Sequence, residues 1–194
     1  MGSQEQMYEL WMHYSSKRDI QLFKTYVDRF LQQYPSSIDL EFKHIAEGRT
    51  LTGPNSATLP DGLLETLVVE LASCSHQCQE IISDWDVLQY ATQIVQVLIA
   101  TCRHHDNIAL VGSCEYFKHI IPLAAAAFKT IPSQEGLYRE LLVNFIQHSL
   151  HLLECMYDPL HLWRRHLSNH VGNTTQSSRP ALLSVEVVPF FYGE

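Results

Sequence analysis

Two cysteines one helical turn apart, Cys74 and Cys78, flank His76, and these residue types could bind a metal ion or act as nucleophiles. Zinc takes four nitrogen or sulfur ligands in a tetrahedral arrangement, and the usual Cys-x-x-Cys pair is missing here. On a helix, His76 also points away from the side that carries the cysteines. Cys102 lies near His104, but without a spacing typical of zinc. We therefore expect buried, reduced thiols that fill the core, with no metal site and no cofactor.

A second group, His148 and His151 with Glu154 further on, could place two imidazoles and a carboxylate along one side of a helix. A zinc metalloprotease needs His-Glu-x-x-His, whereas this stretch reads His-Ser-Leu-His and lacks the glutamate that would serve as the base. We interpret it as a polar stripe beside the core. No Gly-x-Ser-x-Gly elbow, Walker loop or dinucleotide-binding fingerprint occurs in the chain, so we do not expect an enzyme.

A concentrated basic patch consists of Arg164 and Arg165 beside Trp163. Tryptophan with arginine is typical of the anchor of a protein interface. Alternatively, the tryptophan packs on the preceding helix while the arginines pair with that helix's carboxylates or terminal carbonyls, and we favour this alternative. The candidate partner surface includes these three residues and the aromatic residues Phe190, Phe191 and Tyr192.

The charge balance excludes several classes of partner. Thirteen basic against twenty-one acidic residues give a net charge of −8 with histidine neutral, which repels nucleic acid and anionic membranes alike. The five cysteines form no dense, even pattern, as expected for a reducing compartment. Neither a signal peptide nor an apolar stretch of about 18 residues occurs. We therefore expect a cytoplasmic protein that associates with endomembranes only indirectly or peripherally.

Apolar residues recur at intervals of three and four along most of the chain, which predicts amphipathic helices. The clearest helix runs from Ser16, placed with Asp19 like a capping box, to Tyr34, and Pro35 ends it. The stretch Trp85–Arg103 is apolar nearly all round, so other helices should pack around it. Further helices are predicted for residues 3–14, 60–78, 112–128 with a kink at Pro122, 137–156 and 158–167. Turns are predicted at 104–107 and in a long loop at 47–60.

These elements predict an all-α fold, an armadillo- or HEAT-like helical array that forms the start of an α-solenoid. The all-α class is expected because no stretch shows the alternation of apolar and polar residues that is typical of strands. The array is expected because short connectors join neighbouring helices. The helical module should span residues 1–167, followed by a polar, flexible linker at 168–180. The apolar tail at 181–194 is dense in β-branched and aromatic residues and reads as the start of a further element that is missing.

Five short motifs stand out along the chain: Glu9-Leu10-Trp11, Leu59-Pro60-Asp61, Gly112-Ser113-Cys114, Tyr157-Asp158-Pro159 followed by Trp163-Arg164, and the run Ser184–Tyr192. In this order they resemble the N-terminal end of the neurobeachin-like branch of the BEACH-domain proteins, and the last two are the most specific. The resemblance implies a very large cytosolic scaffold in vesicle trafficking and organelle biogenesis. It places an armadillo-like solenoid first and lectin-like, PH-like, BEACH and WD40 modules downstream. The chain ends before the BEACH and WD40 parts, and the resemblance assigns no catalytic or binding residue.

The leading hypothesis is therefore a non-catalytic scaffold segment that acts through protein partners or through the rest of a longer solenoid. The alternative is a small cytosolic protein that depends on a metal or a thiol and uses its cysteines and histidines. A third hypothesis is peripheral membrane attachment through the apolar tail at 181–194.

Overall fold

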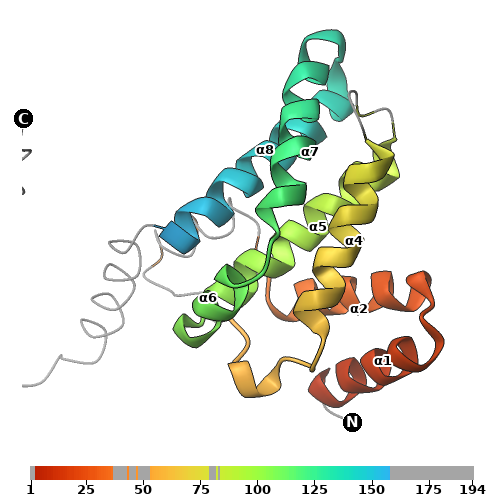
Figure 1. Cartoon of the computed structure of the whole chain (residues 1–194), viewed down its shortest axis with the longest axis vertical. Helices are drawn as coiled ribbons and strands as arrows, with labels where there is room; N and C mark the ends of the chain where they lie inside the picture. Colours follow the sequence, from red (N-terminus) through yellow and green to blue (C-terminus); the bar gives the residue numbers. More distant parts are fainter. Residues whose placement is uncertain are drawn as a thin grey trace, which may run out of the picture.

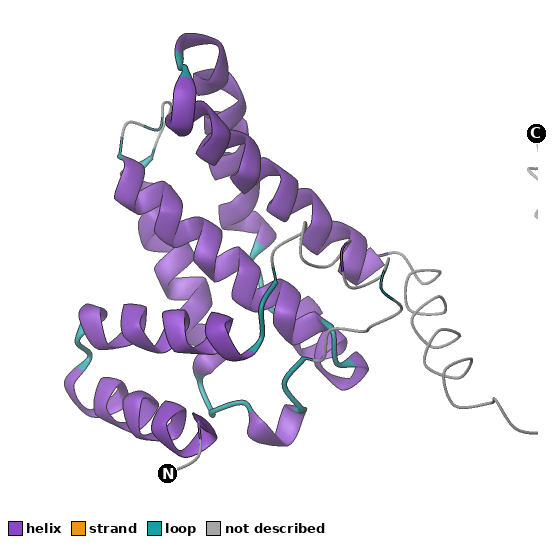
Figure 2. Cartoon of the chain, turned by 180° about the vertical axis from the view of Figure 1, so that it is seen from behind, coloured by secondary structure: helices purple, strands orange, loops and turns teal. Residues whose placement is uncertain are grey.

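The structure, a computed structural model, describes residues 3–36, 43, 47, 53–78, 82 and 84–157. These residues contain seven α-helices, two short 3-10 turns and no strand, so the predicted all-α class is confirmed (Figures 1 and 2). The helices are α1 (Ser3–Lys17), α2 (Ile20–Gln33), α4 (Leu63–Gln77), α5 (Trp85–Cys102), α6 (His105–Gly112), α7 (Phe117–Thr130) and α8 (Gly136–Tyr157), and the 3-10 turns are η1 (Ser56–Thr58) and η2 (Ile131–Ser133).

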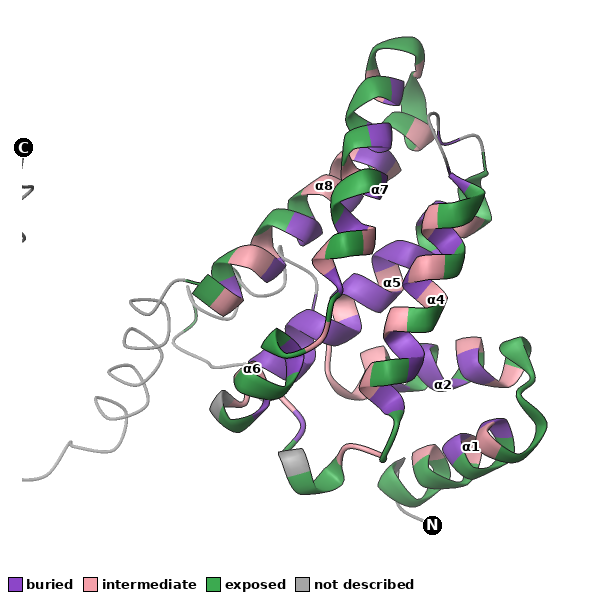
Figure 3. Ribbon diagram, in the orientation of Figure 1, coloured by how far each residue is buried: buried purple, intermediate pink, exposed green. Residues whose placement is uncertain are grey.

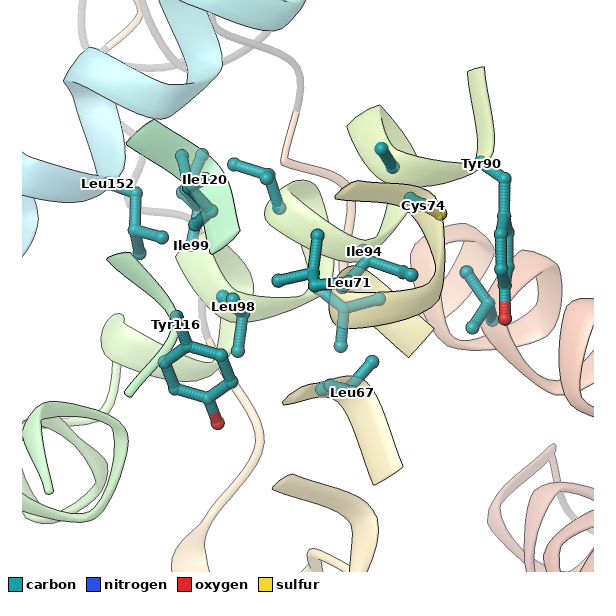
Figure 4. Close-up of a cluster of buried hydrophobic side chains, with 14 of the residues drawn as sticks. Leu67, Leu71, Cys74, Tyr90, Ile94, Leu98, Ile99, Tyr116, Ile120 and Leu152 are labelled. Atoms are coloured by element: carbon teal, nitrogen blue, oxygen red, sulfur yellow. The ribbon is translucent and has the colours of Figure 1, made fainter. Parts of the chain in front are cut away.

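Helix α5 lies at the centre of the described part, as its apolar sequence predicted. It contacts α2, α4, α6 and α8, and its interface with α8 is the most extensive in this part of the chain. Figure 3 shows α5 buried along most of its length. In Figure 4, Leu71 of α4 meets Ile94 of α5, while Leu152 of α8 lies near Ile99. A helix with apolar residues on every side is stabilised only where neighbours cover each of those sides.

The hairpin of α1 and α2 is held by aromatic rings. The Trp11 ring lies 5.5 Å from Tyr14 and 5.5 Å from Tyr26, and Tyr14 lies 4.8 Å from Phe23, measured between centroids. Such pairs add about 0.5–1.5 kcal/mol each beyond the area that they bury. The first helix is too short to be stable alone, and this cluster gives it a partner.

The start of α2 differs from the prediction. Helix α1 continues to Lys17, so Ser16 is not a capping residue for α2. Asp19 is the N-cap instead, because its carboxylate accepts a hydrogen bond from the backbone amide of Gln21 at 2.9 Å. The far end agrees with the prediction, since α2 ends at Gln33 just before Pro35.

The turn predicted at 104–107 is shorter and earlier in the structure, because the chain turns at 103–104 and helix α6 begins at His105. Asn107, a residue common in turns, is fully buried in this helix and donates side-chain hydrogen bonds to the carbonyls of Pro54 and Thr101. These two acceptors satisfy the NH2 group of its side chain, whereas its buried Oδ1 has no hydrogen-bond partner. Helix α7 then starts at Phe117, later than predicted, and runs without a break through Pro122.

The connection between α4 and α5 is fixed to the α7–α8 hairpin at Ile82. The backbone amide of Ile82 donates to Thr130 Oγ1 at 3.3 Å, and its carbonyl accepts from the Tyr138 hydroxyl at 2.6 Å. Ile82 is fully buried, so these two side chains satisfy backbone groups that water cannot reach.

Several predicted elements lie outside the described residues, namely the helix at 158–167, the linker at 168–180 and the tail at 181–194. Of the predicted loop at 47–60, the structure describes residue 47 and residues 53–60, which include η1. No helix among the described residues combines the length and the apolar character that crossing a bilayer requires.

Candidate functional site

The residues predicted as a partner surface, Trp163, Arg164, Arg165, Phe190, Phe191 and Tyr192, all lie outside the described residues. The choice between an interface anchor and packing on the preceding helix therefore stays a prediction. The cysteines and histidines considered as ligands or nucleophiles all lie within the described part, namely Cys74, His76, Cys78, Cys102, His104, His148 and His151.

Cys74 and Cys78 are buried free thiols, as predicted. Burial, and after it the Glu70 carboxylate, raise the pKa of the Cys74 thiol to about 12. Burial and the Asp84 carboxylate also raise the pKa of Cys78. Both thiols are thus protonated near neutral pH and lack the thiolate that nucleophilic attack or metal binding needs. Figure 4 shows Cys74 on α4, within the cluster of buried apolar side chains.

His76, between these cysteines in sequence, is exposed on the helix surface while both thiols are buried. Across the described ranges, no group of three or more histidine, cysteine, aspartate or glutamate residues could hold a metal ion.

His148 is a buried structural residue at the α5–α8 interface. Its Nδ1 lies 2.8 Å from the Asn144 carbonyl oxygen and its Nε2 lies 3.1 Å from Nε2 of Gln96. Because the carbonyl can only accept, we assign the ring proton to Nδ1, and Nε2 accepts from the Gln96 amide. His151 lies 3.3 Å from the Glu154 carboxylate at a more exposed position. The histidines therefore form the predicted polar stripe beside the core.

A groove of about 500 Å³ lies between α1, α2 and the segment 53–61. Beneath it lie Tyr26 and Phe30 of α2, each only 1% exposed, and the partly exposed Tyr34 that caps this helix. Neighbouring rings are 6.2 Å and 5.1 Å apart between centroids. A concave site of this size, with a mainly apolar lining, can hold a small ligand or a side chain of a partner.

The rim of this groove carries one exposed tyrosine and two carboxylates. Tyr8 is 59% exposed, and Glu5 and Asp61 lie among the lining residues together with Pro54 and Pro60. The described lining contains no lysine, arginine, histidine or cysteine. The groove therefore suits recognition of an apolar group beside a positive charge, and it offers no nucleophile with an adjacent base.

Two side chains at the α5–α6 junction position the loop that forms one wall. Arg103 Nη1 donates a hydrogen bond to the Pro35 carbonyl, and Asn107 Nδ2 donates to the Pro54 carbonyl at 2.8 Å. Gly53 packs against the same junction, where an added Cβ would lie 2.4 Å from the Ala100 carbonyl oxygen. The wall is thus supported by the α5–α6 junction as well as by the loop's own hydrogen bonds around Asn55.

A second, more open groove of about 630 Å³ follows α8 beside α5. Its lining includes Arg139, Glu140, Asn144 and Gln147, and His148 at its base is already hydrogen-bonded. Polar groups that are already paired offer a ligand less than the aromatic floor of the first groove does.

The aromatic groove did not emerge from the sequence. The recurrence of aromatic residues at 26, 30 and 34 was visible, but it indicates a core face as readily as a groove floor. The prolines at 54 and 60 indicated a loop but not its contact with α1 and α2.

No protein-family model matches the chain, and no solved structure matches it.

Proposed function

We propose that this chain is a non-catalytic scaffold segment that acts through protein–protein interaction in vesicle and membrane trafficking. The observation that carries the scaffold proposal is the order of helix packing: α2 packs on α5, α5 packs on α8, and α4 packs on α7. Each of the hairpins α1–α2, α4–α5 and α7–α8 contributes its second helix to one continuous layer (Figure 1). Armadillo and HEAT repeats stack in this way, which supports an assignment as the start of an α-solenoid.

The trafficking part of the proposal comes from the resemblance of the five motifs to the neurobeachin-like branch of the BEACH-domain proteins. One of these motifs, Leu59-Pro60-Asp61, lies in the wall of the aromatic groove. The segment would work in the cytoplasm, and it would reach endomembranes through its partners or by peripheral contact.

The partner that suits the aromatic groove is a polypeptide segment with an apolar side chain next to a lysine or an arginine. The partly exposed Tyr34 ring and the exposed Tyr8 ring would cover the apolar side chain, because Tyr26 and Phe30 beneath them are already buried in the core. Glu5 and Asp61 would face the positive charge, and the chain's net charge of −8 favours the approach of a basic segment.

The alternative, a thiol- or metal-dependent protein, draws little support from the geometry. Of the five cysteines that it could use, four are buried, and burial raises the pKa of Cys74 and Cys78. A reactive cysteine needs the opposite environment, one that is partly exposed and electropositive. We therefore keep the scaffold as the single proposed function.

Selection of a phage-displayed peptide library on the full chain tests the groove. We expect a consensus of an apolar residue flanked by lysine or arginine. Tyr8→Arg should weaken binding of a consensus peptide at least about tenfold in fluorescence polarisation, which corresponds to about 1.4 kcal/mol. The matched control is Val69→Arg, which adds the same charge at an exposed position of α4 outside the groove lining.

An acidic consensus, no consensus, or equal weakening by both variants would reject the groove as the partner site. Proximity labelling in cells with the full chain tests the trafficking role separately. We expect enrichment of vesicle-trafficking proteins that Tyr8→Arg reduces and Val69→Arg does not. If only unrelated proteins are labelled, the trafficking role is wrong even where peptide binding holds.

A further inference from the structure

Helix α8 has two apolar sides, and only one of them packs into the core. The core side includes Phe145, Leu152 and Cys155, which are buried. On the opposite side, apolar residues recur at alternating intervals of three and four, which is the spacing of a coiled-coil seam. We name this row the outer seam of α8, and it consists of Val143, Ile146, Leu150, Leu153 and Tyr157. All five are at least partly exposed, with Leu150 at 60% and Tyr157 at 69%.

Helix α7 has the same organisation. Its core side includes Leu123 and Thr130, which are buried. Ile121 is 60% exposed and Phe128 is 71% exposed on the opposite side, so that side is open to solvent. Apolar residues recur there at intervals of four, three and four and form the outer seam of α7, which consists of Phe117, Ile121, Ala124 and Phe128.

The two outer seams lie side by side and form one surface. Helices α7 and α8 pack against each other, and the rings of Phe117 and Tyr157 lie 6.2 Å apart between centroids. His148, about 200° from Leu150 around α8, points to Gln96 of α5, so the outer seam of α8 faces away from the central helix. We name the two seams together the α7–α8 outer face. A contiguous apolar row on two neighbouring helices is typical of a protein interface, whereas single exposed apolar residues are ordinary.

One edge of the α7–α8 outer face is acidic. Glu140, Gln147 and Glu154 recur at intervals of seven, so they follow the outer seam of α8 along one side. Glu140 and Gln147 line the groove beside Gln96 of α5, and the described lining of that groove contains no residue of α7. This edge of α8 is therefore the one away from α7. The Glu154 side chain is 56% exposed there.

The other edge of this face is basic. Ile120 of α7 is buried and lies near Leu152 of α8 in Figure 4. Lys118 and Lys129 lie about 200° and about 180° from Ile120 around the helix, so they occupy the edge of α7 away from α8. The Lys118 side chain is 67% exposed. The α7–α8 outer face thus has an apolar centre between a basic edge and an acidic edge.

We propose that a second copy of this chain covers the α7–α8 outer face, so that the two α7–α8 hairpins form a four-helix bundle. A two-fold axis parallel to the helices places α7 of each copy against α8 of the other. The outer seams then bury each other, and the basic edge of α7 meets the acidic edge of the other copy's α8. A face whose two edges carry opposite charges fits a copy of itself in this arrangement, which favours a second copy over an unrelated chain.

The two-fold arrangement pairs Lys118 with the partner's Glu154. Lys118 adjoins Phe117, and Glu154 lies about one turn before Tyr157. The contact between the rings of Phe117 and Tyr157 shows that both charges lie at the same end of the hairpin. Each has one contact in its own chain, at 3.0 Å and 3.3 Å, but an ammonium group donates three hydrogen bonds and a carboxylate accepts several. Two such pairs therefore flank the seams of the dimer.

Sedimentation equilibrium of the full chain over a range of concentrations tests the proposal. We expect a reversible equilibrium between monomer and dimer. Leu150→Glu should raise the dissociation constant of the dimer at least about tenfold, because it would bury an unpaired carboxylate between the seams. A monomer at every concentration would assign the face to a different protein and overturn the proposal. An open series of larger assemblies would overturn it as well, because a two-fold interface closes on itself.

The matched control is Leu137→Glu, which adds the same charge to the same helix. Leu137 is 71% exposed and lies about 140° from Leu150, outside the outer seam. This variant should leave the dissociation constant within about twofold of that of the natural chain. Circular dichroism should show the same helix content for both variants. Equal weakening of the dimer by the two variants would overturn the proposal.

Charge reversal tests the two-fold arrangement itself. Lys118→Glu and Glu154→Lys each place like charges opposite one another, so each should raise the dissociation constant about threefold or more. Both changes in one chain restore opposite charges and should return the constant to within about twofold of the natural value. A double variant that dimerises as weakly as the single variants would overturn the proposal.

The inference goes beyond the proposed function, because the aromatic groove lies on α1 and α2 and the α7–α8 outer face lies on other helices. Tyr8→Arg, which tests the groove, should leave the dissociation constant of the dimer unchanged. Failure of peptide binding at the groove and failure of the dimer are therefore separate outcomes.

Discussion

The side-chain amide of Asn107 donates a hydrogen bond to the carbonyl oxygen of Pro54 at 2.8 Å and so ties α6 to the wall of the aromatic groove. The same amide reaches the Thr101 carbonyl at 3.1 Å. Asn107→Ala removes both donors and leaves buried acceptors, so we expect a loss of about 1–3 kcal/mol in the free energy of unfolding. Urea unfolding measures it. Gln147→Ala, at an exposed position of α8, should change stability little, and equal losses would contradict the role of Asn107.

Glycine is required at position 53 by contact with the central helix. An added Cβ would lie 2.4 Å from the Ala100 carbonyl oxygen and 2.9 Å from Arg103 Cβ, so the backbone would have to move. We expect Gly53→Ala to lower the midpoint of thermal unfolding, with a cost of about 1–3 kcal/mol. Gly112→Ala is the control, because its Cβ would meet Met156 at an ordinary 3.6 Å and alanine favours the helix. An unchanged midpoint for Gly53→Ala would refute the contact.

The Tyr138 hydroxyl supports the connection between α4 and α5. Tyr138→Phe keeps the ring, which stacks on Trp85 at 5.8 Å, and removes only the donor to the buried Ile82 carbonyl. We expect a destabilisation of about 1–3 kcal/mol, measured by chemical unfolding. The same change at Tyr8, whose side chain is exposed, should have almost no effect. Equal effects at the two tyrosines would show that the Ile82 bond adds nothing.

The reactivity of each thiol should decrease as its burial increases. Cys114 is partly exposed, whereas the other four cysteines, Cys74, Cys78, Cys102 and Cys155, are buried. At pH 8 a disulfide reagent should therefore modify about one thiol quickly in the native protein and all of them in urea. Cys114→Ser should remove the fast phase. Rapid reaction of Cys74, whose pKa is raised to about 12, would revive the thiol-dependent alternative.

The contribution of Glu70 to the free energy of unfolding should fall as the pH rises. Burial raises the pKa of this carboxyl above its usual 4.5, and the Tyr90 hydrogen bond and Lys24 oppose that shift only in part. Its protonated form is thus favoured on folding, so its stabilising contribution is complete below pH 4.5 and is lost as pH rises through the folded-state pKa. The stability of the natural chain relative to Glu70→Gln should fall over that window. Unfolding of both proteins at several pH values measures it, and parallel curves would disprove the shift.

Local features of the sequence determined much of the fold. The stretch around α5 is apolar on every side, which marks a central helix whatever its neighbours are. The Asp84 N-cap and the stop at Pro35 depend on neighbouring residues alone, and the stop was predicted where the structure has it. The stripe of His148 and His151 was also predicted, because helical spacing places those rings beside the core.

Only the tertiary structure decided the features that join distant parts of the chain. Asn107 reads locally as a turn residue, yet it lies in a helix where its NH2 group donates to the carbonyl of Pro54, 53 residues away. Tyr26 reads as part of a core face and is buried in it, whereas only the packing of the segment 53–61 against α1 and α2 leaves a groove above that face. The physical reason is the same in each case. Helical periodicity and capping are set within a few residues, whereas a hydrogen-bond partner or an opposing wall is supplied by a segment whose position depends on how all the helices pack.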